Sequence, residues 1–178
     1  MRRPPSGGGG SGHMASGEAA ALKVVFLDVD GVICCNKYGH LEEEKLQNLR
    51  LVVERSGASI VLSTDWRRSP THKRKLCRVL EDLGMRVIGA TMQGPTMHPV
   101  RPREIIGWLE GYEAERRRHS SPAVLSWVAV DDRQLLCEEM GDRLVRVRSP
   151  ARSGHLPCTC PPPPAQAIER CVESVCDA

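Results

Sequence analysis

Residues 24–33 read VVFLDVDGVI, and this stretch indicates both the fold and the place of its chemistry. It opens with four apolar residues, most of them β-branched or aromatic, which is typical of a strand buried inside a parallel sheet. Asp28, Asp30 and Gly31 follow within four residues. Reactive groups in an open parallel sheet collect beyond the carboxyl ends of its strands. The two acidic residues are therefore the first candidates for chemistry.

Similar short apolar runs recur along the chain and predict strands at 23–27, 59–62, 86–88, 127–130 and 143–147. Between them, apolar residues fall three and four positions apart, which is the period of a helix with one buried face. Gly57 and Gly84 stand where two of these helices should end, because glycine adopts the left-handed conformation of a helix end at no steric cost. Alternating strands and helices predict an α/β fold, a Rossmann-like three-layer sandwich around a central parallel sheet of about five strands.

The 178 residues suffice for one domain with a core, which we place at 22–150. Residues 1–21 are rich in glycine, serine and proline, and we expect a disordered tail or an artificial linker there. Residues 151–178 are rich in proline and cysteine and predict an appendage whose role the sequence leaves open.

The bulk composition suits a soluble globular protein, with 40% hydrophobic and 26% charged residues and a net charge of +3. There is no apolar signal segment and no apolar run approaching the ~20 residues of a membrane span. We expect an intracellular monomer, cytoplasmic or nuclear, that does not contact membranes. Arg2 and Arg3 leave organelle targeting open, and protein partners are unknown.

Polar residues follow three of the predicted strands at their carboxyl ends. Four of these residues are carboxylates that would meet at one edge of the sheet if the first and fourth strands are neighbours: Asp28, Asp30, Asp131 and Asp132. Their mutual repulsion would be severe without a cation. Mg²⁺ takes oxygen ligands and commonly shares one or two carboxylates with a substrate phosphate. The sequence therefore predicts Mg²⁺ as the cofactor.

Four motifs, in order and at consistent spacing over roughly residues 22–149, resemble those of the haloacid dehalogenase (HAD) superfamily. VVFLDVDGVI is similar to its first motif, and Ser63 in IVLSTDWR to its second. Arg101 or Arg103 in VRPREIIGWL resembles the basic third motif, and VAVDDR resembles the acidic fourth motif. Aspartate at the second position of DVD favours phosphate-ester hydrolysis, because dehalogenation needs no acid to protonate a leaving oxygen.

The resemblance implies a role for each matching residue. Asp28 is the nucleophile, and with an ordinary pKa of about 3.9 it would be ionised at neutral pH. Asp30 is the general acid and then the general base, and its backbone carbonyl is a metal ligand together with Asp28 and either Asp131 or Asp132. Ser63 donates a hydrogen bond to the phosphoryl group, and Arg101 or Arg103 neutralises its charge, with Arg101 preferred.

Three further residues near these motifs are candidates for substrate binding, namely Gly31, Thr64 and Arg67. Arg67 belongs to a basic stretch that could follow a phosphate backbone, although a solvated helix face is the commoner role of such a stretch. Trp66 has two interpretations as well. It could stack on a nucleic-acid base, or it could pack beneath the helix that it opens, which is the commoner role.

The finer resemblance is to small HAD domains of nucleic-acid repair proteins, through LSxxWR and VDDR, and to the 3′-phosphatase domain of phage-type polynucleotide kinases, through VDDRQLLCEEM. The chain has no room for a large cap over the site. An open site admits a large phosphorylated substrate, so we expect a nucleic-acid 3′-phosphate end. Two alternatives remain: a small-nucleotide phosphatase, and a catalytically weak binding or adaptor module.

Overall fold

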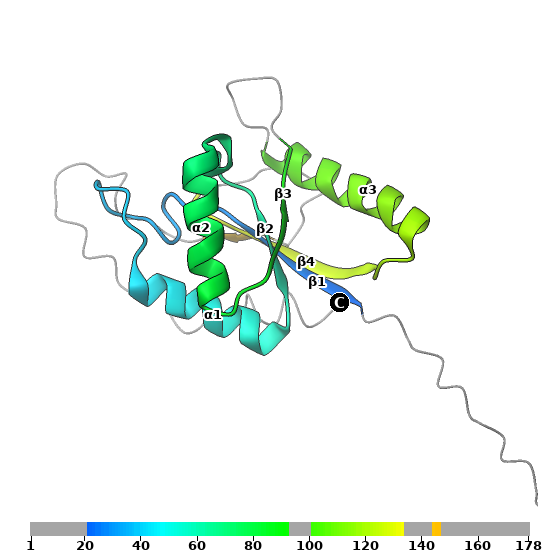
Figure 1. Cartoon of the computed structure of the whole chain (residues 1–178), viewed down its shortest axis with the longest axis horizontal. Coiled ribbons are helices and arrows are strands. Elements are labelled where there is room, and N and C mark those ends of the chain that lie inside the picture. The colour runs from blue at the N-terminus through cyan, green and yellow to red at the C-terminus, as the bar shows by residue number, and fades with distance from the viewer. Residues whose placement is uncertain (1–20, 93–100, 134–143, 147–178) are drawn as a thin grey trace, which may run out of the picture.

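The computed structural model describes residues 21–92, 101–133 and 144–146, and within them a parallel sheet lies between two layers of helices (Figure 1). The sheet has the strand order β3-β2-β1-β4-β5. Its strands are β1 (Leu22–Leu27), β2 (Ser59–Leu62), β3 (Val87–Ala90), β4 (Val124–Asp131) and β5 (Leu144–Arg146). The helices are α1 (Glu43–Ser56), the 3₁₀ helix η1 (Asp65–Arg68), α2 (Pro70–Asp82) and α3 (Arg101–His119).

The predicted α/β fold with a central parallel sheet is confirmed. β1 and β2 match the predicted ranges to within one residue, whereas β4 begins at Val124, before the predicted 127. Four strands have four to eight residues, and β5 adds three residues at the edge of the sheet. The predicted N-terminal tail, except for residue 21, and the predicted C-terminal appendage lie outside the described residues.

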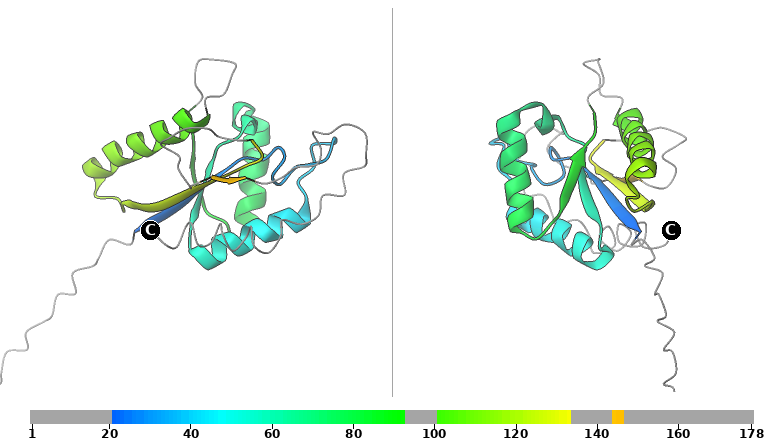
Figure 2. Two further views of the ribbon diagram at one scale, coloured as in Figure 1. Left: turned by 180° about the vertical axis from the view of Figure 1, so that it is seen from behind. Right: turned by 45° about the vertical axis from the view of Figure 1, so that its right-hand side comes forward.

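The side chains of β1 contact both layers of helices, because successive side chains of a strand point to opposite faces of the sheet. Val25 and Leu27 belong to a core cluster with the apolar faces of α1 and α2. Val24 and Phe26 belong to a second cluster with Ile105 of α3. Figure 2 shows the same division, with α1 and α2 on one side of the sheet and α3 on the other.

The strand order places the predicted site residues side by side. β1 lies between β2 and β4, and Leu27 is in register with Leu62 on one side and with Val130 on the other. The next residue of each strand is therefore at the same edge of the sheet. These next residues are Asp28, Ser63 and Asp131.

The ends of the helices agree with local sequence signals. Gly57 caps α1 with φ of +69° and its N–H bonds to Val53 O, as expected for a left-handed glycine. Gly84, with φ of +79°, follows α2 in the same way. α2 begins after Ser69, whose hydroxyl accepts a hydrogen bond from His72 N, and Pro70 occupies the first turn.

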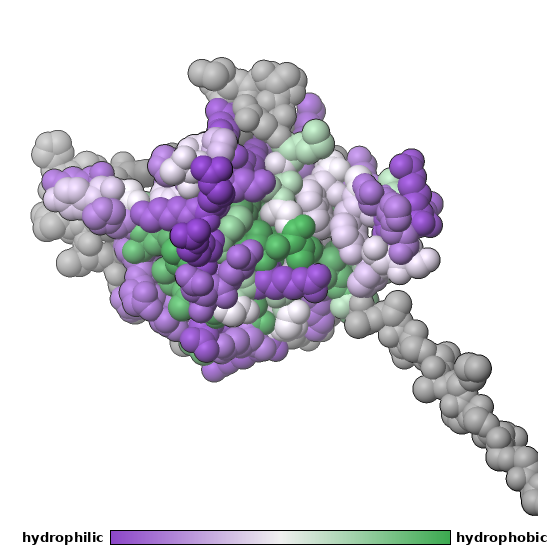
Figure 3. Space-filling model, in the orientation of Figure 1, coloured by the Kyte–Doolittle hydropathy of each residue, from purple (hydrophilic) through white to green (hydrophobic). Residues whose placement is uncertain are grey.

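Between β1 and β2 the chain forms one loop and α1, and between β2 and β3 it forms η1 and α2. Neither connection holds a cap domain, as the sequence predicted. Figure 3 shows that the outer surface of α1 and α2 is hydrophilic, with hydrophobic residues in the gaps between the elements. In the described part of the chain, no helix combines the length and the apolar character needed to cross a membrane.

Candidate active site

The turn after β1 is built around the backbone carbonyl of Val29, which accepts hydrogen bonds from the amides of Val32, Ile33 and Cys34. Gly31 makes this turn possible, since its φ of +85° is rarely adopted by residues with a side chain. A Cβ atom at Gly31 would also overlap the carboxylate of Asp132. The structure thus gives Gly31 a packing role, while the predicted contact of Gly31 with substrate stays a prediction.

Three carboxylates gather at this turn. Ligand oxygens of Asp28, Asp131 and Asp132 all lie within 4.8 Å of one another, and the first two residues are buried. The carboxylate of Asp30 is not a member of this group, whereas the predicted contact through its backbone carbonyl stays a prediction. When all three carboxylates are ionised, the guanidinium of Arg101 offsets only part of their negative charge, and a divalent cation would offset the rest. The donor set is therefore the kind that Mg²⁺ binds.

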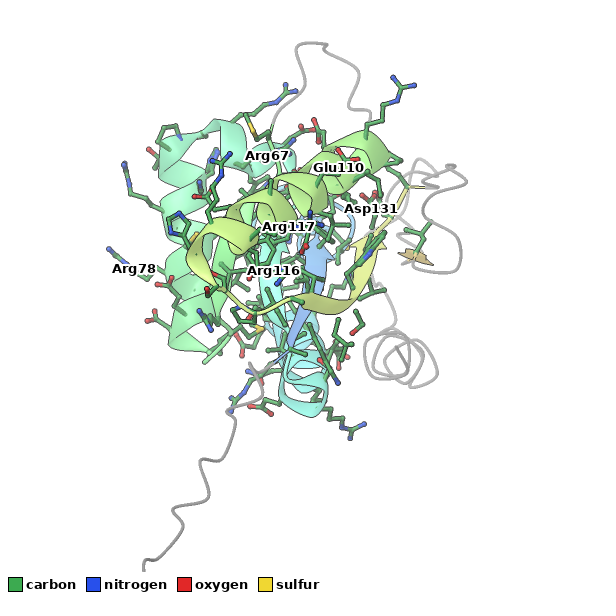
Figure 4. All side chains as sticks on the ribbon, turned by 90° about the vertical axis from the view of Figure 1, so that its right-hand side faces the viewer. Arg67, Arg78, Glu110, Arg116, Arg117 and Asp131 are labelled. Atoms are coloured by element: carbon green, nitrogen blue, oxygen red, sulfur yellow. The ribbon has the colours of Figure 1, made fainter. Side chains whose placement is uncertain are left out.

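Arg101 is the basic residue of the site. It begins α3, its side chain is 2% exposed, and its Nη1 lies 2.5 Å from Asp28 Oδ2 and 2.7 Å from Asp131 Oδ2. Arg103 is exposed on the same helix. Of the two arginines, Arg101 is therefore the one that lies beside the acidic residues, while its predicted contact with a phosphate stays a prediction. Figure 4 shows the far end of α3, with Arg116 and Arg117, facing the viewer, so those arginines lie away from the first turn that carries Arg101.

The electrostatics of Asp28 differ from the expectation of an ordinary carboxyl. Burial raises the pKa of Asp28 to about 6, although Arg101 lowers it, and the nearby Asp131 raises it further. Burial by itself lowers the pKa of Arg101, but Asp28 and Asp131 together raise it above its ordinary value, so the guanidinium stays charged. A carboxyl group with this pKa is still mostly ionised at pH 7, as expected, but its pKa lies above the ordinary value because several elements bury it, which the sequence alone does not reveal.

Two hydrogen-bond donors of the site are buried without a hydrogen-bond partner among the described residues: Ser63 Oγ and Arg101 Nε. The backbone N–H of Ser63 donates to Leu27 O at 2.8 Å, which fixes the residue at the end of β1 and β2. A buried polar atom without a partner typically costs about 1–3 kcal/mol. Atoms left in this state at the edge of a sheet are explained if a bound ligand supplies the missing hydrogen bonds.

Thr64 and Arg67 are occupied by contacts within the protein. The hydroxyl of Thr64 caps η1 by accepting a hydrogen bond from Trp66 N at 3.3 Å. The guanidinium of Arg67 donates to Thr64 O and to Thr91 O, and its Nη2 lies 2.7 Å from Glu104 Oε2. Both residues hold η1 in place, so these contacts weigh against their role in substrate binding, which stays a prediction.

Trp66 makes a contact that the sequence did not suggest. Its indole N–H donates to Asp30 Oδ1 at 3.0 Å, and its ring also packs on the core cluster beneath α1 and α2. Of the two roles predicted for Trp66, packing beneath a helix is observed, while stacking on a base stays a prediction. The useful signal was the position of Trp66 three residues after Ser63, since β2 ends beside β1.

Residues 24–151 match the protein family described as the HAD domain in Swiss Army Knife RNA repair proteins. This range covers most of the chain and contains all the predicted site residues. Neither a search of the curated proteins nor a search of the solved structures gives a match.

Proposed function

Because the chain belongs to the family of HAD domains in Swiss Army Knife RNA repair proteins, we propose that it is a Mg²⁺-dependent phosphohydrolase acting on nucleic-acid 3′-phosphate ends. The proposed class of reaction, phosphate-ester hydrolysis, rests on membership of the HAD superfamily. The proposed substrate rests on the association of this family with RNA repair proteins and on the lack of a cap in the described connections. An open site leaves room for a large substrate to approach a buried nucleophile.

The observation that carries the proposal is a pair of buried atoms, Ser63 Oγ and Arg101 Nε, that have no hydrogen-bond partner in the part of the chain that the structure describes. They lie at the edge of the sheet that also bears Asp28. In the proposed reaction, these two groups donate hydrogen bonds to the phosphoryl oxygens. A buried guanidinium stabilises the charge that spreads over those oxygens in the transition state. Donors left unused at this position suit a site that binds an anion.

The reaction proceeds in two steps on Asp28. Its carboxylate oxygen forms a bond to phosphorus while the bond from phosphorus to the ester oxygen breaks, and Asp30 gives that leaving oxygen a proton. Water then attacks the phosphorus of the acyl phosphate, with Asp30 taking a proton from the water. Inorganic phosphate leaves, and both aspartates return to their first state.

Asp28, Asp131 and Asp132 would hold the metal ion through carboxylate oxygens. A bound Mg²⁺ supplies positive charge that offsets the repulsion between the nucleophile and the substrate phosphate. The same charge favours the ionised form of Asp28, whose burial otherwise raises its pKa to about 6. The deep burial of the nucleophile thus supports the proposal that a cation binds beside it.

The test is phosphate release in the presence of Mg²⁺ from a 3′-phosphorylated oligonucleotide, compared with a 5′-phosphorylated oligonucleotide, mononucleotides, a phosphopeptide and an aryl phosphate. Asp28→Asn should abolish release. Asp82→Asn, the same change at an exposed position of α2, is the matched control and should retain it.

Selective release from the 3′ end would support the proposal in full. Preference for mononucleotides would favour a small-nucleotide phosphatase, and equal release from every substrate would support the reaction without the substrate. A folded protein that releases no phosphate from any of them in Mg²⁺ would contradict the proposal and favour a binding or adaptor module.

A further inference from the structure

Asp30 differs from Asp28 in what holds its side chain. Asp28 is buried and paired with Arg101, whereas Asp30 is exposed and lies outside the group of three carboxylates. An exposed carboxylate in a turn normally samples several rotamers. A general acid must instead present its proton within hydrogen-bond reach of the leaving oxygen. Something other than burial must therefore orient Asp30.

The contact available for this purpose comes from Trp66, 36 residues further along the chain, whose Nε1–H donates to Asp30 Oδ1 at 3.0 Å. The indole N–H is a donor only. It therefore occupies Oδ1 as an acceptor whether the carboxyl group is ionised or protonated. The proton of the neutral acid is then carried by the other oxygen, Oδ2.

Trp66 is itself held firmly by its surroundings. Its backbone N–H donates to the hydroxyl of Thr64, and its carbonyl accepts from Ser69 N at 3.2 Å. Its ring packs against the core cluster and lies 5.3 Å from the ring of His72. The neighbouring Arg67 joins η1 to β3 through Thr91 O and to α3 through Glu104. The indole donor thus has a fixed position relative to the sheet.

We propose that Trp66 is a positioning residue, which holds Oδ1 of Asp30 so that Oδ2 delivers the proton to the leaving oxygen; this inference rests on the proposed function. In the first step, Asp28 forms a bond to phosphorus while the bond from phosphorus to the ester oxygen breaks. As that ester oxygen leaves, it takes the proton from Oδ2 of Asp30. In the second step, the same oxygen takes a proton from the attacking water. Trp66 exchanges no proton and touches no reacting atom.

The leaving group distinguishes this role from a merely structural one. An alkoxide, such as the sugar oxygen of a nucleic acid, leaves poorly without a proton, whereas a nitrophenolate leaves readily without one. A misplaced acid therefore slows alkyl phosphates and spares aryl phosphates. General loss of structure slows both equally. The quantity to compare is kcat/KM, since it reports the steps up to formation of the acyl phosphate.

The experiment uses the full chain with Mg²⁺ and two substrates of similar size, para-nitrobenzyl phosphate and para-nitrophenyl phosphate, beside a 3′-phosphorylated oligonucleotide. For Trp66→Phe, we expect kcat/KM to fall on the order of tenfold for the benzyl and oligonucleotide substrates, and less than about twofold for the phenyl substrate. Trp108→Phe removes an indole that packs on Phe26 and Tyr112, away from Asp30, and should affect neither substrate selectively.

A second comparison protects the test against misfolding. In an Asp30→Ala background, adding Trp66→Phe should change kcat/KM for the benzyl substrate by less than about twofold, because a residue that acts through Asp30 has nothing left to position. Thermal unfolding of each variant checks that the protein is folded.

Equal losses on both substrates for Trp66→Phe, or an undiminished loss in the Asp30→Ala background, would overturn the inference. In either case an active wild type that depends on Asp28 would leave the proposed function standing. A wild type that hydrolyses none of the substrates would contradict the proposed function, and this inference with it.

Discussion

Two arginines are buried at the same edge of the sheet, but their surroundings differ. Around Arg67, Nε, Nη1 and Nη2 each have a partner, namely two backbone carbonyls and Glu104. Around Arg101, Nη1 serves two carboxylates while Nε has no partner among the described residues. The side chains are similarly hidden, at 5% and 2% exposure.

The difference shows that burial of an arginine does not by itself mark a functional site. A guanidinium whose donors are all used by the protein joins elements together, as Arg67 joins η1, β3 and α3. A guanidinium with a spare donor beside carboxylates that repel one another is arranged for a charged ligand. The comparison predicts that the same substitution will affect stability at one position and activity at the other.

The largest effect is expected from Arg67→Met on stability. This change removes the partner of Glu104, a residue whose side chain is 7% exposed, and it frees the backbone carbonyls of Thr64 and Thr91. Breaking a buried ion pair typically costs about 3–5 kcal/mol. Urea unfolding followed by circular dichroism measures the change. A loss below about 1 kcal/mol would show that Arg67 does not join these elements.

Arg101→Met should act chiefly on catalysis. Removing one buried donor to the developing charge is expected to lower kcat on the order of 10²–10³-fold with Mg²⁺ present. Its stability in Mg²⁺ should fall less than that of Arg67→Met, because the metal offsets the charges of Asp28 and Asp131. If Arg101→Met proves the less stable variant and the more active one, the comparison between the two arginines is reversed.

The buried Asp28 beside Arg101 predicts that stability falls as the pH rises, which is unusual for a carboxyl group. The folded pKa of Asp28, about 6, lies above the value of about 3.9 for an unfolded carboxyl, so the folded state binds the proton more tightly. The contribution of Asp28 protonation to the free energy of unfolding is therefore complete below about pH 4. It is lost as the pH rises to about 6, a loss on the order of 3 kcal/mol.

The measurement is the free energy of unfolding in a metal chelator from pH 4 to 8, for wild type and Asp28→Asn. The wild type should lose stability relative to Asp28→Asn as the pH rises to about 6 and then stay level. Asp82→Asn controls for the loss of a carboxylate at an exposed position. A constant difference between wild type and Asp28→Asn over the whole range would show that burial does not raise the pKa of Asp28.

The smallest effect is expected at the turn beside the acidic group. Gly31→Ala places a methyl group where the side chain of Asp132 lies and strains a φ of +85°, and we expect a loss of roughly 2–3 kcal/mol. Gly39→Ala is the matched change, since its φ is +68° with nothing within 4 Å of the added carbon. It should cost only about 1 kcal/mol. Equal losses in thermal unfolding would contradict a role for Gly31 in packing Asp132.

Local pattern predicted much of this fold, because the strands are short apolar runs and the polar residues that follow them mark where each strand ends. Once β1 lies between β2 and β4, the register of Leu27 with Leu62 and Val130 brings Asp28, Ser63 and Asp131 together. These positions could therefore be predicted from strand ends alone. β3 was placed less well at its end, where Gly89 and Ala90 are small, and β4 at its start, where Ser126 interrupts the apolar run.

The rest of the site depends on how the layers pack, which the sequence does not reveal. Arg101 and Arg103 are equally basic, and only the placement of α3 on the sheet buries the first and exposes the second. The hydrogen bond between Trp66 and Asp30 joins residues far apart in the chain. The raised pKa of Asp28 likewise follows from burial by several elements together.

The central claim is that Asp28 is a nucleophile that carries the phosphoryl group during turnover. The most direct measurement is mass spectrometry of the peptide containing Asp28 after rapid acid quenching of the protein with Mg²⁺ and a 3′-phosphorylated oligonucleotide. We predict one phosphoryl group on Asp28 in the wild type and none in Asp28→Asn. Phosphate release without any phosphoryl group on Asp28, or with that group on another residue, would contradict the account.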